Sequence, residues 1–140
     1  MAAQRPVILE TLRDLLEAEV LAVNSRVCFP WDAKLNPDDG SMLQVAMGES
    51  TVDNGDTIGM WLHRINIKIG AVVAGSFDYP EAWAILDDVA AAIAADYTLS
   101  GSCEYITVTG CGDSIDVAGD KIMWPHLAAT IEYMTPRGAL

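Results

Sequence analysis

Basic residues are scarce in this chain. Eight lysines and arginines stand against twenty acidic residues, which gives a formal net charge of −12. The basic residues form no stripe along the sequence: Arg5, Arg13, Arg26, Lys34, Arg64, Lys68, Lys121 and Arg137. Because lysine and arginine neutralise the phosphates of a nucleic acid, this composition argues against tight nucleic-acid binding. An acidic surface can instead act as a repulsive wall past which a polyanion slides.

Cysteine is rare as well. The three residues, Cys28, Cys103 and Cys111, are odd in number and show no C-x-x-C spacing. We therefore expect neither a disulfide framework nor a zinc site. Because cysteine is among the residue types most often buried, we expect these three to be buried free thiols.

Long apolar runs are missing, although apolar residues make up 51% of the chain. No run reaches the roughly 18 residues that a membrane-spanning helix needs. Near the N-terminus, Glu10, Arg13 and Asp14 interrupt the stretch in which a signal peptide would carry uninterrupted apolar residues. We therefore expect a soluble, intracellular protein with no membrane partner, whose residues 1–140 form a single domain with one core.

Motifs of catalysis and cofactor binding are also absent. The sequence contains no G-x-S-x-G, Walker A or dinucleotide-binding glycine pattern. Its two histidines are His63 and His126, and a Cys111–His126 pair could in principle serve nucleophilic catalysis. No sequence feature places that pair together, and structural histidines are far commoner. We expect no catalytic residue and no cofactor.

Two acidic segments contain residue types that occur in calcium-binding loops. Residues 38–40 (DDG) and 53–56 (DNGD) lack the alternation of ligands that an EF-hand loop requires. We interpret them as solvated turn carboxylates and expect no metal site.

The clearest pattern that is present lies between residues 58 and 97. Residues 61–69 alternate between two faces, which predicts a strand with one buried side. The mainly apolar face carries Trp61, His63, Ile65, Ile67 and Ile69, and the polar face carries Arg64, Asn66 and Lys68. Asp78 and Glu81 then form a capping-box pattern at the start of an alanine-rich amphipathic helix that Gly101 ends. Its predicted buried stripe is Leu86, Val89, Ile93 and Tyr97.

The other elements follow from similar periodicities. Apolar residues at three- and four-residue spacing predict a helix over residues 6–23. Short extended segments are predicted at 26–29, 42–47, 104–109 and 126–134, with Pro125 at the start or edge of the last. Residues 48–56 and 110–120 read as acidic, glycine-containing connections, the second with a possible short strand at 115–117. We therefore predict an α+β fold of order α-β-β-β-α-β-β, in which two amphipathic helices pack on a mainly antiparallel β-sheet.

This order of elements resembles the tail terminator, or tail completion, proteins of long-tailed bacteriophages, the minor tail protein U-like group. The segments that carry the resemblance are residues 8–16 (ILETLRDLL), 62–69 (LHRINIKI), 82–93 (AWAILDDVAAAI) and 130–134 (TIEYM). The resemblance implies a virion protein that forms a hexameric ring on the tail tube. That ring stops tube growth, contacts the tail-tube protein and the head-side neck protein, and lets DNA pass through its lumen. The family has no catalytic residues to carry over.

Candidate interface residues come from tryptophans and acidic segments. Trp31 and Trp124 lie beside prolines at the predicted ends of elements, where a large aromatic side chain often anchors a partner, although core packing is the commoner role. The acidic residues expected at the lumen or at ring contacts are Asp38, Asp39, Glu49, Asp53, Asp56, Asp113, Asp116 and Asp120.

Three alternatives stay open. The first is a small α+β ligand-binding or enzymatic domain, which needs convergent polar groups on its inward faces. Those faces offer only His63 and Tyr105. The second is a tail-tube or neck protein of the same general organisation, and the third is an oligomeric adaptor outside any virus.

Overall fold

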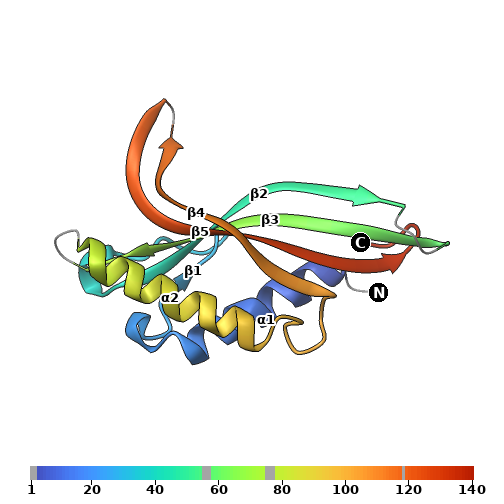
Figure 1. Ribbon diagram of the computed structural model, residues 1–140, viewed down its shortest axis with the longest axis horizontal. Coiled ribbons are helices and arrows are strands. Elements are labelled where there is room, and N and C mark those ends of the chain that lie inside the picture. The colour runs from blue at the N-terminus through green and yellow to red at the C-terminus, as the bar shows by residue number, and fades with distance from the viewer. Residues whose placement is uncertain (1–2, 55–57, 75–77, 118) are drawn as a thin grey trace.

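The computed structural model describes residues 3–54, 58–74, 78–117 and 119–140, without the side chains of 115–117 and 121. Figure 1 shows two long helices on one side of a twisted sheet. The elements in chain order are α1 (Gln4–Glu19), the 3-10 turn η1 (Leu21–Val23), β1 (Val27–Cys28), the 3-10 turn η2 (Pro37–Asp39), β2 (Met42–Asp53), β3 (Met60–Val72), α2 (Tyr79–Ala95), β4 (Tyr105–Val117) and β5 (Asp120–Pro136). The predicted α+β class and the order of its elements are confirmed.

One five-stranded sheet has the strand order β1-β2-β3-β5-β4. The short β1 runs parallel to β2. The remaining neighbours, β2 with β3, β3 with β5 and β5 with β4, are all antiparallel. These four strands, β2, β3, β5 and β4, are long, so most of the sheet is antiparallel, as its alternating sequence pattern predicts.

The core lies between the helices and the sheet. On β3, Ile65, Ile67 and Ile69 are buried and belong to the same cluster as Leu12 of α1 and Leu86 of α2. The opposite face of the sheet has no helix over it in Figure 1, and we call it the outer face. On β3 this face carries the polar residues that alternate with the isoleucines, so the alternation read from the sequence matches the layers of the fold.

The N-terminal helix is shorter than its periodicity predicts. The apolar stripe that the spacing predicts is buried throughout: Leu9, Leu12, Leu16, Val20 and Val23. However, α1 ends at Glu19 and the chain continues through η1. Asn24 and Ser25 then adopt positive φ angles of 48° and 63°, which turns the chain away from the helix axis. The apolar spacing therefore continued past the end of the α-helix because the 3-10 turn buries Val23 on the same side.

The predicted buried stripe of α2 is wrong at its last position. The helix ends at Ala95, and the Tyr97 side chain beyond it is 58% exposed. Leu99, which has a positive φ of 48° in the following turn, is fully buried. The i+4 spacing no longer applies after the helix ends, so the turn delivers a different residue to the core.

Both predicted acidic connections contain strand. Residues 48–53 continue β2, with an irregularity in the register between Met47 and Ser50. Residues 110–117 continue β4, whose register shifts near Gly110 and again between Gly112 and Ser114. These β-bulges accommodate glycines such as Gly48 and Gly110, which the sequence pattern predicts to lie in turns.

Pro125 lies inside β5 and does not begin it. The pairing of β3 with β5 ends at Gly70 and His126, and on the other side Pro125 falls opposite the irregularity of β4. Proline has no N–H to donate, so this break in both ladders is where a strand can hold it.

The expectation for the three thiols holds only in part. Cys28 is buried, Cys103 is partly buried and Cys111 is exposed on β4. Burial raises the pKa of the Cys103 thiol to about 11, so this thiol stays protonated at neutral pH.

Candidate interaction surface

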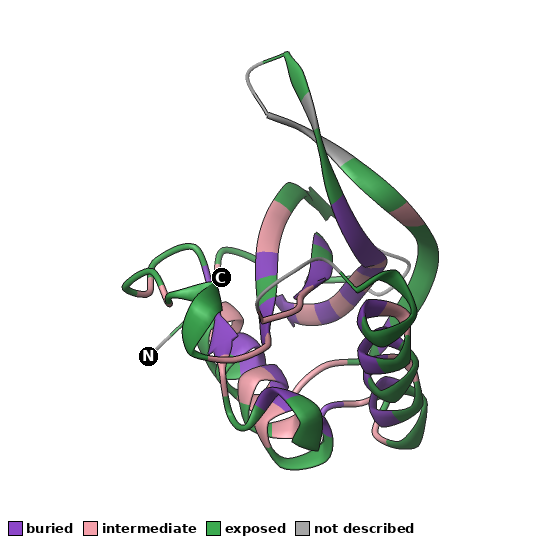
Figure 2. Cartoon of the chain, turned by 90° about the vertical axis from the view of Figure 1, so that its left-hand side faces the viewer, coloured by how far each residue is buried: buried purple, intermediate pink, exposed green. Residues whose placement is uncertain are grey.

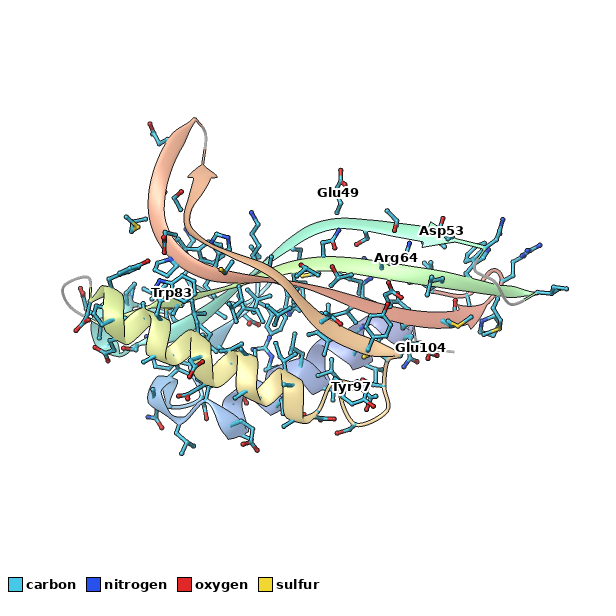
Figure 3. The ribbon with its side chains drawn as sticks, in the orientation of Figure 1. Glu49, Asp53, Arg64, Trp83, Tyr97 and Glu104 are labelled. Atoms are coloured by element: carbon cyan, nitrogen blue, oxygen red, sulfur yellow. The ribbon has the colours of Figure 1, made fainter. Side chains whose placement is uncertain are left out.

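A network of charged groups crosses the outer face. Arg64 on β3 donates hydrogen bonds to Glu132 on β5 (Nε to Oε1, 2.8 Å) and to Asp53 on β2 (Nη1 to Oδ2, 3.1 Å). Burial by itself raises the pKa of Glu132, but hydrogen bonds from Arg64 and Tyr105 outweigh it and hold that pKa below its ordinary value. Arg64 thus ties three strands together, and two carboxylates already engage its charge (Figure 3).

An open groove lies farther along the same face. It has a volume of about 280 Å³ and a mostly apolar lining that includes the small residues Ala46, Gly48 and Ala128. Lys68 also lines it, and within the described residues Lys68 takes part in no ion pair. The groove therefore combines room, apolar walls and an uncompensated positive charge.

A hairpin projects from the sheet beside this groove. Beyond the Gly70–His126 pair, β4 and β5 pair with each other and, among the described residues, with no other strand. Figure 1 shows them rising from the outer face. We call residues 113–124 the arm. Where the structure describes its residues, Figure 2 colours the arm mostly as exposed, and on β5 it exposes Ile122 (49%) and Met123 (59%).

Polar contacts to α2 fix the root of the arm on one side. The carboxylate oxygen Oδ1 of Asp113 accepts hydrogen bonds from the hydroxyl of Tyr79 (2.9 Å) and from Nε1 of Trp83 (3.1 Å). The hydrogen bond to Asp113 raises the pKa of the Tyr79 hydroxyl. The two aromatic rings lie edge to face at 6.3 Å, so α2 presents a preformed pair of donors.

Aromatic packing fixes the other side of the root. The indole of Trp124 lies directly over Gly70, where a Cβ atom would come within 1.8 Å of the ring. His126 stacks on this indole with 5.1 Å between ring centroids, and its Nδ1 donates to the Trp124 carbonyl at 2.8 Å. Trp124 is only 8% exposed. Of the two candidate tryptophans, this one serves packing within the chain, and it lies inside a strand and not at an element end.

Trp31 has a different environment. It is 57% exposed and stacks on Phe29 with 5.0 Å between ring centroids. The guanidinium of Arg13 also contacts the Phe29 ring and donates to Asp32 at 2.7 Å. Trp31 lines a shallow crevice of about 260 Å³ against the first turns of α1. Its exposure keeps it available to a partner.

The candidate acidic residues fall into three groups that the structure does not bring together. Asp38 and Asp39 lie in η2, before β2. Glu49 and Asp53 lie on β2, where Glu49 stands on the outer side in Figure 3. Asp113 and Asp120 lie on the arm. Asp56 and the Asp116 side chain are outside the described residues.

Asp53 and Asp113 are among the predicted residues, but sequence reasoning missed Arg64, Glu132 and Lys68 and the contacts that organise this surface. The Arg64–Glu132 pair, the Asp113 contact to α2 and the position of Lys68 in a groove all depend on strand register. The only signal in the sequence was that Arg64 and Lys68 fall on the polar face of β3.

The two histidines occupy structural positions. His63 is fully buried, stacks on Tyr133 at 4.4 Å, and its Nε2 lies 2.7 Å from the Thr135 hydroxyl. Burial, followed by the charge of Arg5, lowers the pKa of His63. Cys111 lies opposite Leu127 while Gly112 lies opposite His126. Since neighbouring residues of a strand point to opposite faces, the Cys111 sulfur and the imidazole of His126 point away from each other.

Among the described residues, no group of three or more His, Cys, Asp and Glu side chains is placed to hold a metal ion. Within the same part of the chain, no helix is long and apolar enough to cross a membrane. No family model matches the chain, and no curated protein matches it.

Proposed function

We propose that this chain is a structural protein of a long-tailed bacteriophage virion. In this proposal it forms a ring that ends the tail tube and joins it to the head-side neck. The observation that carries the proposal is the arm, a two-stranded ribbon that projects from the sheet with Ile122 exposed on it. A projecting ribbon with aliphatic side chains on its surface is suited to contact another subunit, since such side chains gain free energy when they leave water.

The charge of the chain supports the same function. DNA must pass through such a ring without being retained, and a chain of net charge −12 repels a polyanion. Acidic residues on the arm and on β2 supply part of this charge: Glu49, Asp53, Asp113 and Asp120.

The deciding experiment is assembly in solution. We expect light scattering and negative-stain imaging to show a closed ring, formed alone or on tail-tube subunits, and we expect the ring to stop the growth of tubes. A chain that stays monomeric with tail-tube subunits present contradicts the proposal. Long tubes formed by the chain alone favour a tail-tube protein. Tight DNA binding with a steep salt dependence contradicts the repulsive lumen.

A further inference from the structure

In the part of the chain that the structure describes, no third strand pairs with the arm. A two-stranded ribbon is at best marginally stable by itself in water. The contacts at Asp113 and Trp124 hold only the root, and Ile122 farther along is 49% exposed. A second surface that covers the arm would remove this apolar area from water.

One face of the arm combines an apolar and an acidic residue. Asp120 and Ile122 are two positions apart on β5, and the register of β4 with β5 is regular between them. Residues at this spacing point to the same face of a strand. Met123 therefore lies on the opposite face. The arm as a whole is acidic, with Asp113, Asp116 and Asp120 against Lys121.

The groove on the outer face offers the complementary features. Its small side chains leave room for an aliphatic group, and Lys68 provides a cation beside it. Arg13 and Arg64 are each engaged by carboxylates of their own chain, whereas Lys68 forms no ion pair within the described residues. None of the arm residues whose side chains the structure describes lines the groove of its own chain. In Figure 1 the arm rises away from the sheet.

We propose that the arm of one copy docks into the groove of a second copy of this chain, with Ile122 among the small residues and Asp120 facing Lys68. The two contacting surfaces are different, so the contact is heterologous and repeats from copy to copy until it closes a ring or extends a filament. This inference rests on the self-assembly in the proposed function and names the surfaces that carry it.

Two single variants separate the two sides of the contact. Ile122→Lys damages the arm and leaves the groove intact, while Lys68→Glu damages the groove and leaves the arm intact. Each is expected to raise the concentration needed for half-assembly at least about tenfold. Mixing the two is expected to give a one-to-one complex that does not grow, because only one productive contact is left. Sizing by light scattering reads out both results.

Matched controls cover charge, exposure and folding. Lys34→Glu makes the same charge change on another exposed lysine, and Leu21→Lys places a charge at a residue that is 78% exposed. Met123→Lys alters the same ribbon on its other face. All three are expected to assemble like the wild type. Thermal melting followed by circular dichroism shows whether each variant is folded.

A charge reversal tests the pair directly. Lys68→Asp combined with Asp120→Lys restores opposite charges across the contact and is expected to recover assembly.

The outcomes distinguish the two proposals. A ring that still forms at wild-type concentration with Ile122→Lys and with Lys68→Glu overturns the contact and leaves the proposed function standing. Open filaments that depend on Ile122 and Lys68 support the contact and contradict the terminating ring. A one-to-one complex of the two damaged variants that exceeds the self-association of either alone would be strong support.

Discussion

The indole N–H of Trp83 on α2 donates to the Asp113 carboxylate on β4 at 3.1 Å, and this contact joins the helical layer to the root of the arm. Tyr79, one helical turn earlier, donates to the same oxygen at 2.9 Å. A single aspartate at the start of the arm thereby fixes the direction in which the hairpin leaves the sheet.

Replacing Trp83 by phenylalanine keeps a ring on α2 but removes its N–H donor. Because this hydrogen bond is exposed, we expect the free energy of unfolding to fall by only about 0.5 kcal/mol. Amide exchange in the arm should accelerate more than exchange in α1. Trp31→Phe is the control, since Trp31 stacks on Phe29 far along the chain from the arm. Equal exchange rates in the arm of the wild type and Trp83→Phe would contradict this anchoring role.

The Trp124 ring packs so closely on Gly70 that only glycine fits at this position. A Cβ at this position would lie 1.8 Å from an atom of the Trp124 ring, so Gly70→Ala must displace the indole and is expected to destabilise the fold by about 1–3 kcal/mol. Denaturant unfolding and tryptophan fluorescence measure the effect. Gly110→Ala is the matched control, because a Cβ there meets no atom within 4 Å. In a Trp124→Ala background the cost of Gly70→Ala should largely vanish, and a cost that persists would show that the clash is not its cause.

Thr135 fixes the tautomer of His63. Its hydroxyl donates to the Ala139 carbonyl at 2.9 Å, so the hydroxyl can only accept from the imidazole, and Nε2 must carry the proton. Thr135→Val leaves this buried N–H without an acceptor and is expected to cost about 1–3 kcal/mol. Chemical unfolding measures the loss, and nitrogen NMR shifts of the imidazole report the tautomer. A wild-type spectrum with the proton on Nδ1 would refute the assignment.

Acid should weaken the fold through His63. Its pKa is lowered by burial, so the unfolded chain takes up the proton first as the pH falls below the unperturbed value of about 6.5. Stability is therefore fully present above that pH and declines below it, until the folded pKa is passed. The measurement is denaturant unfolding of the wild type and His63→Gln from about pH 7.5 to 5. We expect the wild type to lose more stability than the variant, and parallel pH profiles would contradict this.

Much of the fold could be predicted from the sequence because its signals are local. Alternation from residue 61 to residue 69 predicted a strand with Ile65 and Ile67 buried, and the spacing of leucines predicted which face of α1 packs inward. Asp78 was predicted as the helix cap, and its side chain accepts from the Glu81 amide at 3.1 Å. These features depend on residues close together in the chain.

The interaction surface could not be predicted in the same way. Glycines and aspartates in residues 110–120 indicated a loop, yet the cross-strand ladder of β4 with β5 holds them as a projecting hairpin. Cys111 was expected to be buried and is exposed, and Trp124 packs on Gly70, which lies 54 positions away in sequence. Pairing between strands overrides weak local propensities because its hydrogen bonds form along the whole ribbon.

The sequence by itself determined the α+β class, the order of the elements and the apolar faces that form the core, since periodicity of 2 and of 3.6 residues is written in neighbouring positions. Only the tertiary structure decided that the acidic glycine-containing segment becomes an arm, that Asp113 is anchored to α2, and that Lys68 stands without an ion partner within the described residues beside small side chains. Those relationships join residues distant in the chain, and strand register sets them.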